Sequence, residues 1–153
     1  MRKTINTTIL ATLLLTSSCV SNVVQHQHKT IGKDGWKRND TITFELPHVK
    51  EDGMYDIRAE LRTTTTFPYS KVYIAYKAEL VRPLAIHCDT ICIETSSHTT
   101  QGHHGGVTIK AYSNAGSKLA LHEGQSGVIK IYHIMSEENI PNLVDVGMKC
   151  YLP

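Results

Sequence analysis

The sequence predicts an all-β fold, an antiparallel sandwich of two sheets of the immunoglobulin or jelly-roll kind, behind an N-terminal signal peptide and a short tether. Three observations lead to this prediction. Apolar and polar residues alternate with period two in several stretches, most clearly over residues 55–62. Turn signals separate these stretches at intervals of about a dozen residues. No helical period is sustained for three turns, and a closed barrel is the alternative architecture.

The first 18 residues have the layout of a lipoprotein signal peptide. Arg2 and Lys3 precede an apolar run over residues 9–15, which is too short for a bilayer core that needs about 20 apolar residues. Small residues at 17 and 18 and then Cys19 resemble a lipobox, although Leu15 lies four residues before the cysteine rather than three. We expect Cys19 to carry diacylglycerol and a further acyl chain such as palmitate, because two or more chains anchor a protein stably. An ordinary signal peptide with an incidental cysteine is the alternative.

This interpretation divides the chain into a signal peptide at 1–18, a lipidated N-terminus with a flexible tether at 19–35, and a β-sandwich domain at 36–153. The tether is polar and without periodicity. His26 and His28 within it could contact a metal ion, but a solvated linker is the preferred interpretation. Val20, rather than an aspartate, directly follows Cys19, and residues 21–29 contain no acidic cluster. We therefore expect anchoring in the outer membrane, on its periplasmic side.

Strands are expected in order along the domain. Residues 42–46 alternate and end at Pro47, and residues 55–62 follow a turn signal at 51–53. Residues 71–81 are apolar on both faces, which predicts a central strand. After Arg82 and Pro83, further strands are expected at 86–94, 107–112, 119–122, 128–135 and 144–152. Residues 95–106 are expected to form a loop, and Ser136 opens the one candidate helical turn.

Three cysteines remain if Cys19 is lipidated, an odd number that permits one disulfide. Cys88 and Cys92 would lie roughly 13 Å apart in a strand at about 3.3 Å per residue, whereas a disulfide needs Cα atoms within about 7 Å. These two therefore do not pair unless the chain turns between them. Cys150 could pair with Cys88 or Cys92 if their strands are neighbours, and three buried thiols without a bridge are the preferred interpretation.

The loop at 95–106 contains the candidate metal ligands His98, His103 and His104 among glycines. Imidazoles suit zinc, but a closed zinc site usually has four ligands. Adjacent histidines in a strand would also point to opposite faces. A solvated loop without metal is the preferred interpretation, and we expect no metal and no cofactor.

Several function classes find no support in the sequence. The formal charge of +2 comes from 16 basic and 14 acidic residues spread along the chain, so we expect no nucleic-acid partner. No Gly-x-Ser-x-Gly elbow is present. Asp52, Asp56 and Glu60 are better explained as a solvated strand face than as paired catalytic carboxylates. We expect no catalytic residues and a protein that is not an enzyme.

Taken together, scattered positions resemble the gliding-motility lipoprotein family GldH of Bacteroidetes. They are Cys19, Trp36, residues 40–44, residues 55–62, Gly127, Ile131, Met135, residues 140–141 and residues 144–147. The resemblance implies an accessory or assembly component of the envelope machinery for gliding and its linked secretion system, with other envelope proteins as partners. The alternative is a carbohydrate-binding sandwich lipoprotein of the outer membrane, in which aromatic side chains contact sugar rings. The candidates are Trp36, Tyr69, Tyr73, Tyr76, Tyr112 and Tyr132, most of which are expected in the core or in cross-strand pairs.

Overall fold

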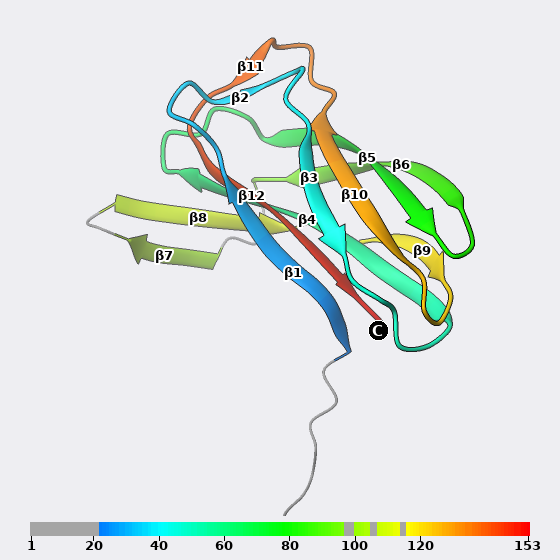
Figure 1. Ribbon diagram of the computed structural model, residues 1–153. Coiled ribbons are helices and arrows are strands. Elements are labelled where there is room, and N and C mark those ends of the chain that lie inside the picture. Colours follow the sequence, from blue (N-terminus) through cyan, green and yellow to red (C-terminus); the bar gives the residue numbers. More distant parts are fainter. Residues whose placement is uncertain (1–21, 97–99, 105–106, 114–115) are drawn as a thin grey trace, which may run out of the picture.

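Two large antiparallel sheets and one two-stranded sheet form the computed structural model, which describes residues 22–96, 100–104, 107–113 and 116–153 (Figure 1). These residues contain twelve strands and no helix. The prediction of an all-β antiparallel fold is therefore confirmed. Both sheets have free edges within the described part of the chain, in agreement with a sandwich rather than a closed barrel.

The larger sheet has the order β1-β12-β4-β8-β7, and β9 pairs with the first half of β4. Its central strand, β4, pairs with β12 along one side and with β9 and then β8 along the other. The strands of this sheet are β1 (Val23–Thr30), β4 (Gly53–Thr64), β7 (Thr100–His104), β8 (Val107–Ser113), β9 (Ser117–Leu121) and β12 (Leu143–Tyr151).

The smaller sheet has the order β3-β10-β5-β6. Its strands are β3 (Ile42–Leu46), β5 (Lys71–Val81), β6 (Ala85–Glu94) and β10 (Ser126–His133). The prediction that residues 71–81 form a central strand is confirmed, because β5 lies between β10 and β6. In the third sheet, which has two strands, β2 (Trp36–Lys37) pairs antiparallel with β11 (Asn139–Ile140).

The core lies between the sheets and follows the alternation of the sequence. Tyr55, Ile57, Ala59 and Leu61 of β4 are buried, as is the matching set on β5, namely Val72, Ile74, Tyr76, Ala78 and Leu80. Fully burying one large apolar side chain contributes roughly 1.5–3 kcal/mol. The buried faces of these two long strands therefore contribute much of the free energy that holds the two sheets together.

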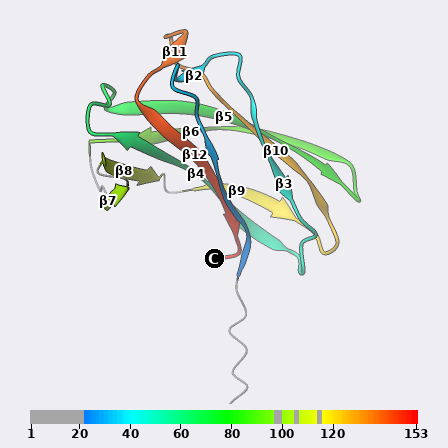
Figure 2. The ribbon, with the colours of Figure 1, turned by 60° about the vertical axis from the view of Figure 1, so that its left-hand side comes forward.

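The start of β1 and the end of β12 lie together at one end of the sandwich, and β2 and β11 lie at the other in both views (Figures 1 and 2). Leu152 donates its backbone N–H to the carbonyl of Asn22 at 2.9 Å. At the same end the side-chain amide of Gln25 donates to the carbonyl of Glu45 at 2.9 Å. This bond links the edge strands β1 and β3 of the two sheets.

The structure corrects three local predictions. Residues 23–30 belong to the domain as β1 and are not a flexible tether, because their backbone pairs with β12 from Val23 to Thr30. Residues 100–104 form β7 on the edge of the larger sheet, so the predicted loop at 95–106 is wrong for this part. Ser136 opens no helix, since the chain bends there and enters β11.

Candidate functional site

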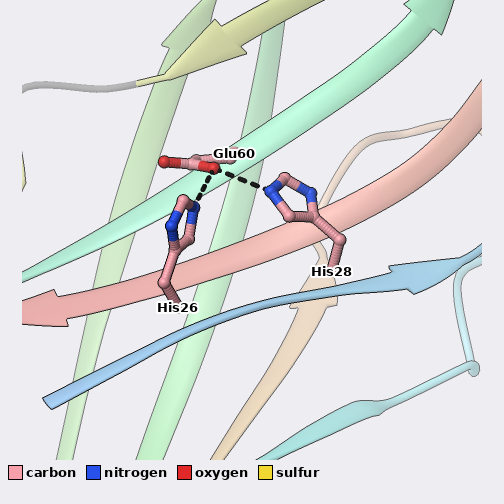
Figure 3. Close-up of side chains that lie close together, drawn as sticks. All are labelled: His26, His28 and Glu60. Atoms are coloured by element: carbon pink, nitrogen blue, oxygen red, sulfur yellow. Dashed lines mark hydrogen bonds and ion pairs between the residues drawn. The ribbon is translucent and has the colours of Figure 1, made fainter. Parts of the chain in front are cut away.

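A cluster of polar side chains lies on the outer face of the larger sheet, where β12 runs between β1 and β4. In the backbone register, Gly147 of β12 is opposite both His28 of β1 and Glu60 of β4. His26 lies two residues before His28 and therefore projects from the same face of β1. Figure 3 shows both histidine rings directed at the Glu60 carboxylate across β12. We call His26, His28 and Glu60 the histidine cluster.

The polar atoms of the histidine cluster lie close together. Nε2 of His26 lies 2.9 Å from Oε2 of Glu60, and Nε2 of His28 lies 3.0 Å from the same oxygen. The two imidazole rings are tilted against each other with centroids 5.4 Å apart. One ligand-type atom from each residue lies within 4.8 Å of the other two. Two imidazoles and a carboxylate at this separation are a donor set that can coordinate a divalent transition metal.

Asp145 supports the cluster from the neighbouring row of the sheet. Its Oδ1 lies 2.9 Å from Nδ1 of His28. The same oxygen accepts a hydrogen bond from Nε of Arg62 at 2.8 Å. Asp145 is buried, so its carboxylate depends on these partners to offset the loss of water. The ring of His28 is therefore held in one orientation.

Gly147 provides the space in which the His28 ring lies. A Cβ atom at this position would stand 2.5 Å from Cε1 and Nδ1 of His28 and 3.0 Å from Nε2. A glycine inside a strand usually marks the close approach of another group to the backbone. Here that group is the His28 ring, which crosses β12 over Gly147 to reach Glu60.

A second feature is the tip of the β5–β6 hairpin, where apolar side chains face solvent. Leu84 is 83% exposed and Ile86 is 64% exposed, and Val81 beside them is also exposed. Val81 and Leu84 line a groove of about 660 Å³ together with Gln25 of β1. We call Val81, Leu84 and Ile86 the apolar tip. In the described part of the chain, β6 pairs only with β5, so its outer backbone edge is free for another strand.

The structure describes some of the site residues that the sequence predicts. Cys19 and His98 lie outside the described residues. His103 and His104 lie on β7, opposite Thr108 and Val107 of β8, and their side chains are outside the description. The possible bridge from Cys150 to Cys88 or Cys92 is not formed, because all three thiols are free, and the expectation of three buried thiols is correct for Cys150 alone. Cys150 is buried in β12, whereas Cys88 and Cys92 are exposed on β6 of the other sheet.

Trp36 does not present its ring to a ligand, as the carbohydrate-binding alternative requires. It is fully buried, its indole N–H donates to the carbonyl of Asp40 at 2.9 Å, and its ring packs edge-on against His133. Tyr76 and Tyr112 are buried as well, while Tyr73 is exposed. The structure therefore removes the main residue of that alternative.

Two residues of the histidine cluster are recognisable as candidate ligands in the sequence, and Glu60 is not. His26 and His28 have the spacing of neighbours on one strand face, but the absence of apolar alternation favoured a linker. Glu60 and Asp145 are distant in sequence, and only strand register joins them. A glycine within the apolar run of β12 was the one local signal of a close approach there.

Among the described residues, no helix has the length and apolar character needed to cross a membrane. A family model described as GldH lipoprotein matches residues 23–150. The match begins at the first residue of β1 and ends within β12, so it covers nearly the whole described sandwich. No curated protein matches the chain.

Proposed function

The chain belongs to the GldH lipoprotein family, and from this premise we propose that it is a non-enzymatic subunit of an envelope complex. In this proposal, a lipid on Cys19 holds the domain on the periplasmic side of the outer membrane. The domain then acts as an accessory or assembly component of the gliding-motility machinery and its linked secretion system. The family match over residues 23–150 is the observation that supports the proposal most directly.

The anchor is tested by removing the acylated sulfur. Two or more acyl chains bind a membrane stably, whereas one binds only marginally. Cys19→Ala should therefore release the protein from the membrane fraction, while the thermal unfolding midpoint of the domain stays unchanged. Fractionation of inner and outer membranes by density measures the location of the wild-type protein. A Cys19→Ala variant that still sediments with outer membranes would contradict the anchor.

We place the contact with the partner at the apolar tip. Exposed apolar side chains that gather at one place on a surface often mark a protein contact. The free edge of β6 begins next to the tip and could add a strand of the partner by backbone hydrogen bonding. A lipid anchor also confines both proteins to one surface, so a contact of modest affinity suffices.

The partner is tested by affinity capture of the tagged, lipidated protein from solubilised envelopes. Leu84→Ser with Ile86→Ser should abolish capture of the partner without changing the unfolding midpoint, because both side chains are mostly exposed. Met54→Ser is the matched control, since Met54 is an apolar side chain 52% exposed on β4. A deletion strain should also secrete less protein through the linked system. Normal secretion together with capture of no envelope protein would contradict the proposal.

A further inference from the structure

We propose that the histidine cluster, formed by His26, His28 and Glu60, binds a divalent transition-metal ion, and that zinc fits the donor set best. Zinc binds histidine nitrogen at about 2.0–2.1 Å and carboxylate oxygen at about 2.0–2.2 Å, so its ligands stand about 3.4 Å from one another in a tetrahedral site. The histidine nitrogens already lie 2.9 and 3.0 Å from the Glu60 oxygen. A small outward movement of the side chains admits the ion.

The hydrogen bonding of His28 supports a cation at this position. Both oxygens of an ionised carboxylate are acceptors, so Nδ1 of His28 must carry the proton that it shares with Asp145. In the neutral ring, Nε2 then has a lone pair that faces Oε2 of Glu60 at 3.0 Å, which is an acceptor against an acceptor. Either a second proton on the ring or a cation between the two atoms resolves the conflict. A metal ion would resolve it for His28, and Nε2 of His26, which lies 2.9 Å from the same Glu60 oxygen, is placed to coordinate the same ion.

The residues around His28 orient its ring for metal coordination. Metal-bound histidines commonly donate their other ring N–H to a carboxylate, which fixes the tautomer and raises the basicity of the coordinating nitrogen. Asp145 supplies that carboxylate, and Arg62 fixes it in turn. Gly147 leaves the space through which His28 reaches Glu60. These contacts come from three neighbouring strands and position the cluster before any ion arrives.

In the part of the chain that the structure describes, the cationic side chains next to the cluster are directed to other partners. Arg58 and Lys149 lie in the row of the sheet next to Glu60, and both turn to the ring of Tyr151, at 5.0 and 5.1 Å from its centroid. Arg62 is paired with Asp145. His26 lies on the edge strand and is exposed, so water can fill the fourth position. An ion held here ties the edge strand β1 to the central strand β4 across β12.

Zinc binding by the full chain in detergent, without a histidine tag, tests the proposal. Calorimetric titration with zinc chloride should show one ion per chain and an unfolding midpoint that rises with zinc concentration. His26→Gln with His28→Gln should remove both effects. His48→Gln with His122→Gln is the matched control, because these exposed histidines lie outside the cluster, and it should bind as the wild type does. Asp145→Asn should weaken binding by about 10- to 100-fold through loss of positioning.

Three results would overturn the inference: no binding by the wild type, equal binding by the His26→Gln/His28→Gln variant, or loss of binding when His98, His103 and His104 are replaced instead. Unfolding midpoints in chelator show whether each variant folds. The single variant His26→Gln keeps the test decisive if the double variant is unstable, because its side chain is exposed. It should bind zinc more weakly than the wild type, and unchanged affinity would also overturn the inference.

Discussion

Replacing Gly147 with alanine should destabilise the metal-free protein through a single contact. The new Cβ would stand 2.5 Å from two atoms of the His28 ring, and the three nearest heavy atoms all belong to that ring. Ordinary carbon contacts are about 3.5–4.0 Å, so the ring must retreat by about 1 Å. It would then lose its 2.9 Å contact with Asp145.

The size of the effect follows from two opposing terms. Forcing an extra methyl group into a packed position costs about 1–3 kcal/mol. Alanine in a strand is favoured over glycine by roughly 0.5–1 kcal/mol, which offsets part of this cost. Gly147→Ala should therefore lower the free energy of unfolding by about 1 kcal/mol. In a His28→Ala background the ring is gone, and Gly147→Ala should stabilise the protein by roughly 0.5–1 kcal/mol.

Urea unfolding of the wild type, the two single variants and the double variant, all in chelator, measures this reversal of sign. Gly32→Ala is the control, because nothing lies within 4 Å of a Cβ at Gly32. It should change the free energy of unfolding by less than about 0.5 kcal/mol. An equal loss from Gly147→Ala with and without the His28 ring would refute the reasoning.

Three further predictions follow from other parts of the fold. Burial, and to a lesser extent the charge of Asp56, raises the pKa of Cys150 to about 12, so a thiol reagent should modify Cys88 and Cys92 in the native protein and Cys150 only after denaturation. Burial lowers the pKa of His133 below its ordinary 6.5. The unfolded chain then binds the proton first, so the free energy of unfolding should fall as pH drops below about 6.5, less steeply in His133→Phe, and equal slopes would contradict this. Gly35 has φ +87°, and a Cβ there would meet the carbonyl oxygen of Ile140 at 2.5 Å. Gly35→Ala should therefore lower the free energy of unfolding in urea by more than about 1 kcal/mol. Gly32→Ala is again the control and should change it little.

The fold class and most strands were predictable because burial alone decides their pattern. Residues 55–62 alternate since one face of β4 meets the core and the other meets water, and the apolar residues of this stretch are the buried ones. Residues 71–81 read as a central strand because their second face is partly covered as well. The alternation of apolar and polar residues within one strand shows that one face of the strand is buried, so it can be detected in a single sequence.

Strand β1 and the histidine cluster were not predictable in this way. Apart from Val23 and Val24 at its start, β1 is polar on both faces, over residues 25–30. These residues form a strand because they hydrogen-bond to β12, which is more than a hundred residues away in sequence. The meeting of His28 with Glu60 depends on register across that same strand. Register is set by the whole sheet, so pairings of this kind leave no periodic signal in either partner.

The position of β1 also fixes how far the domain could stand from a membrane. Cys19 precedes Val23, the first residue of β1, by four residues, which span at most about 14 Å at about 3.3–3.6 Å per residue. If Cys19 is acylated, this short connection would hold the domain close to the membrane, with the start of β1 facing the lipid headgroups. The groove that Gln25 shares with Val81 and Leu84 lies at that end. A partner that meets the apolar tip would then have to sit in or on the bilayer, whereas a partner diffusing in the periplasm would first meet β2 and β11.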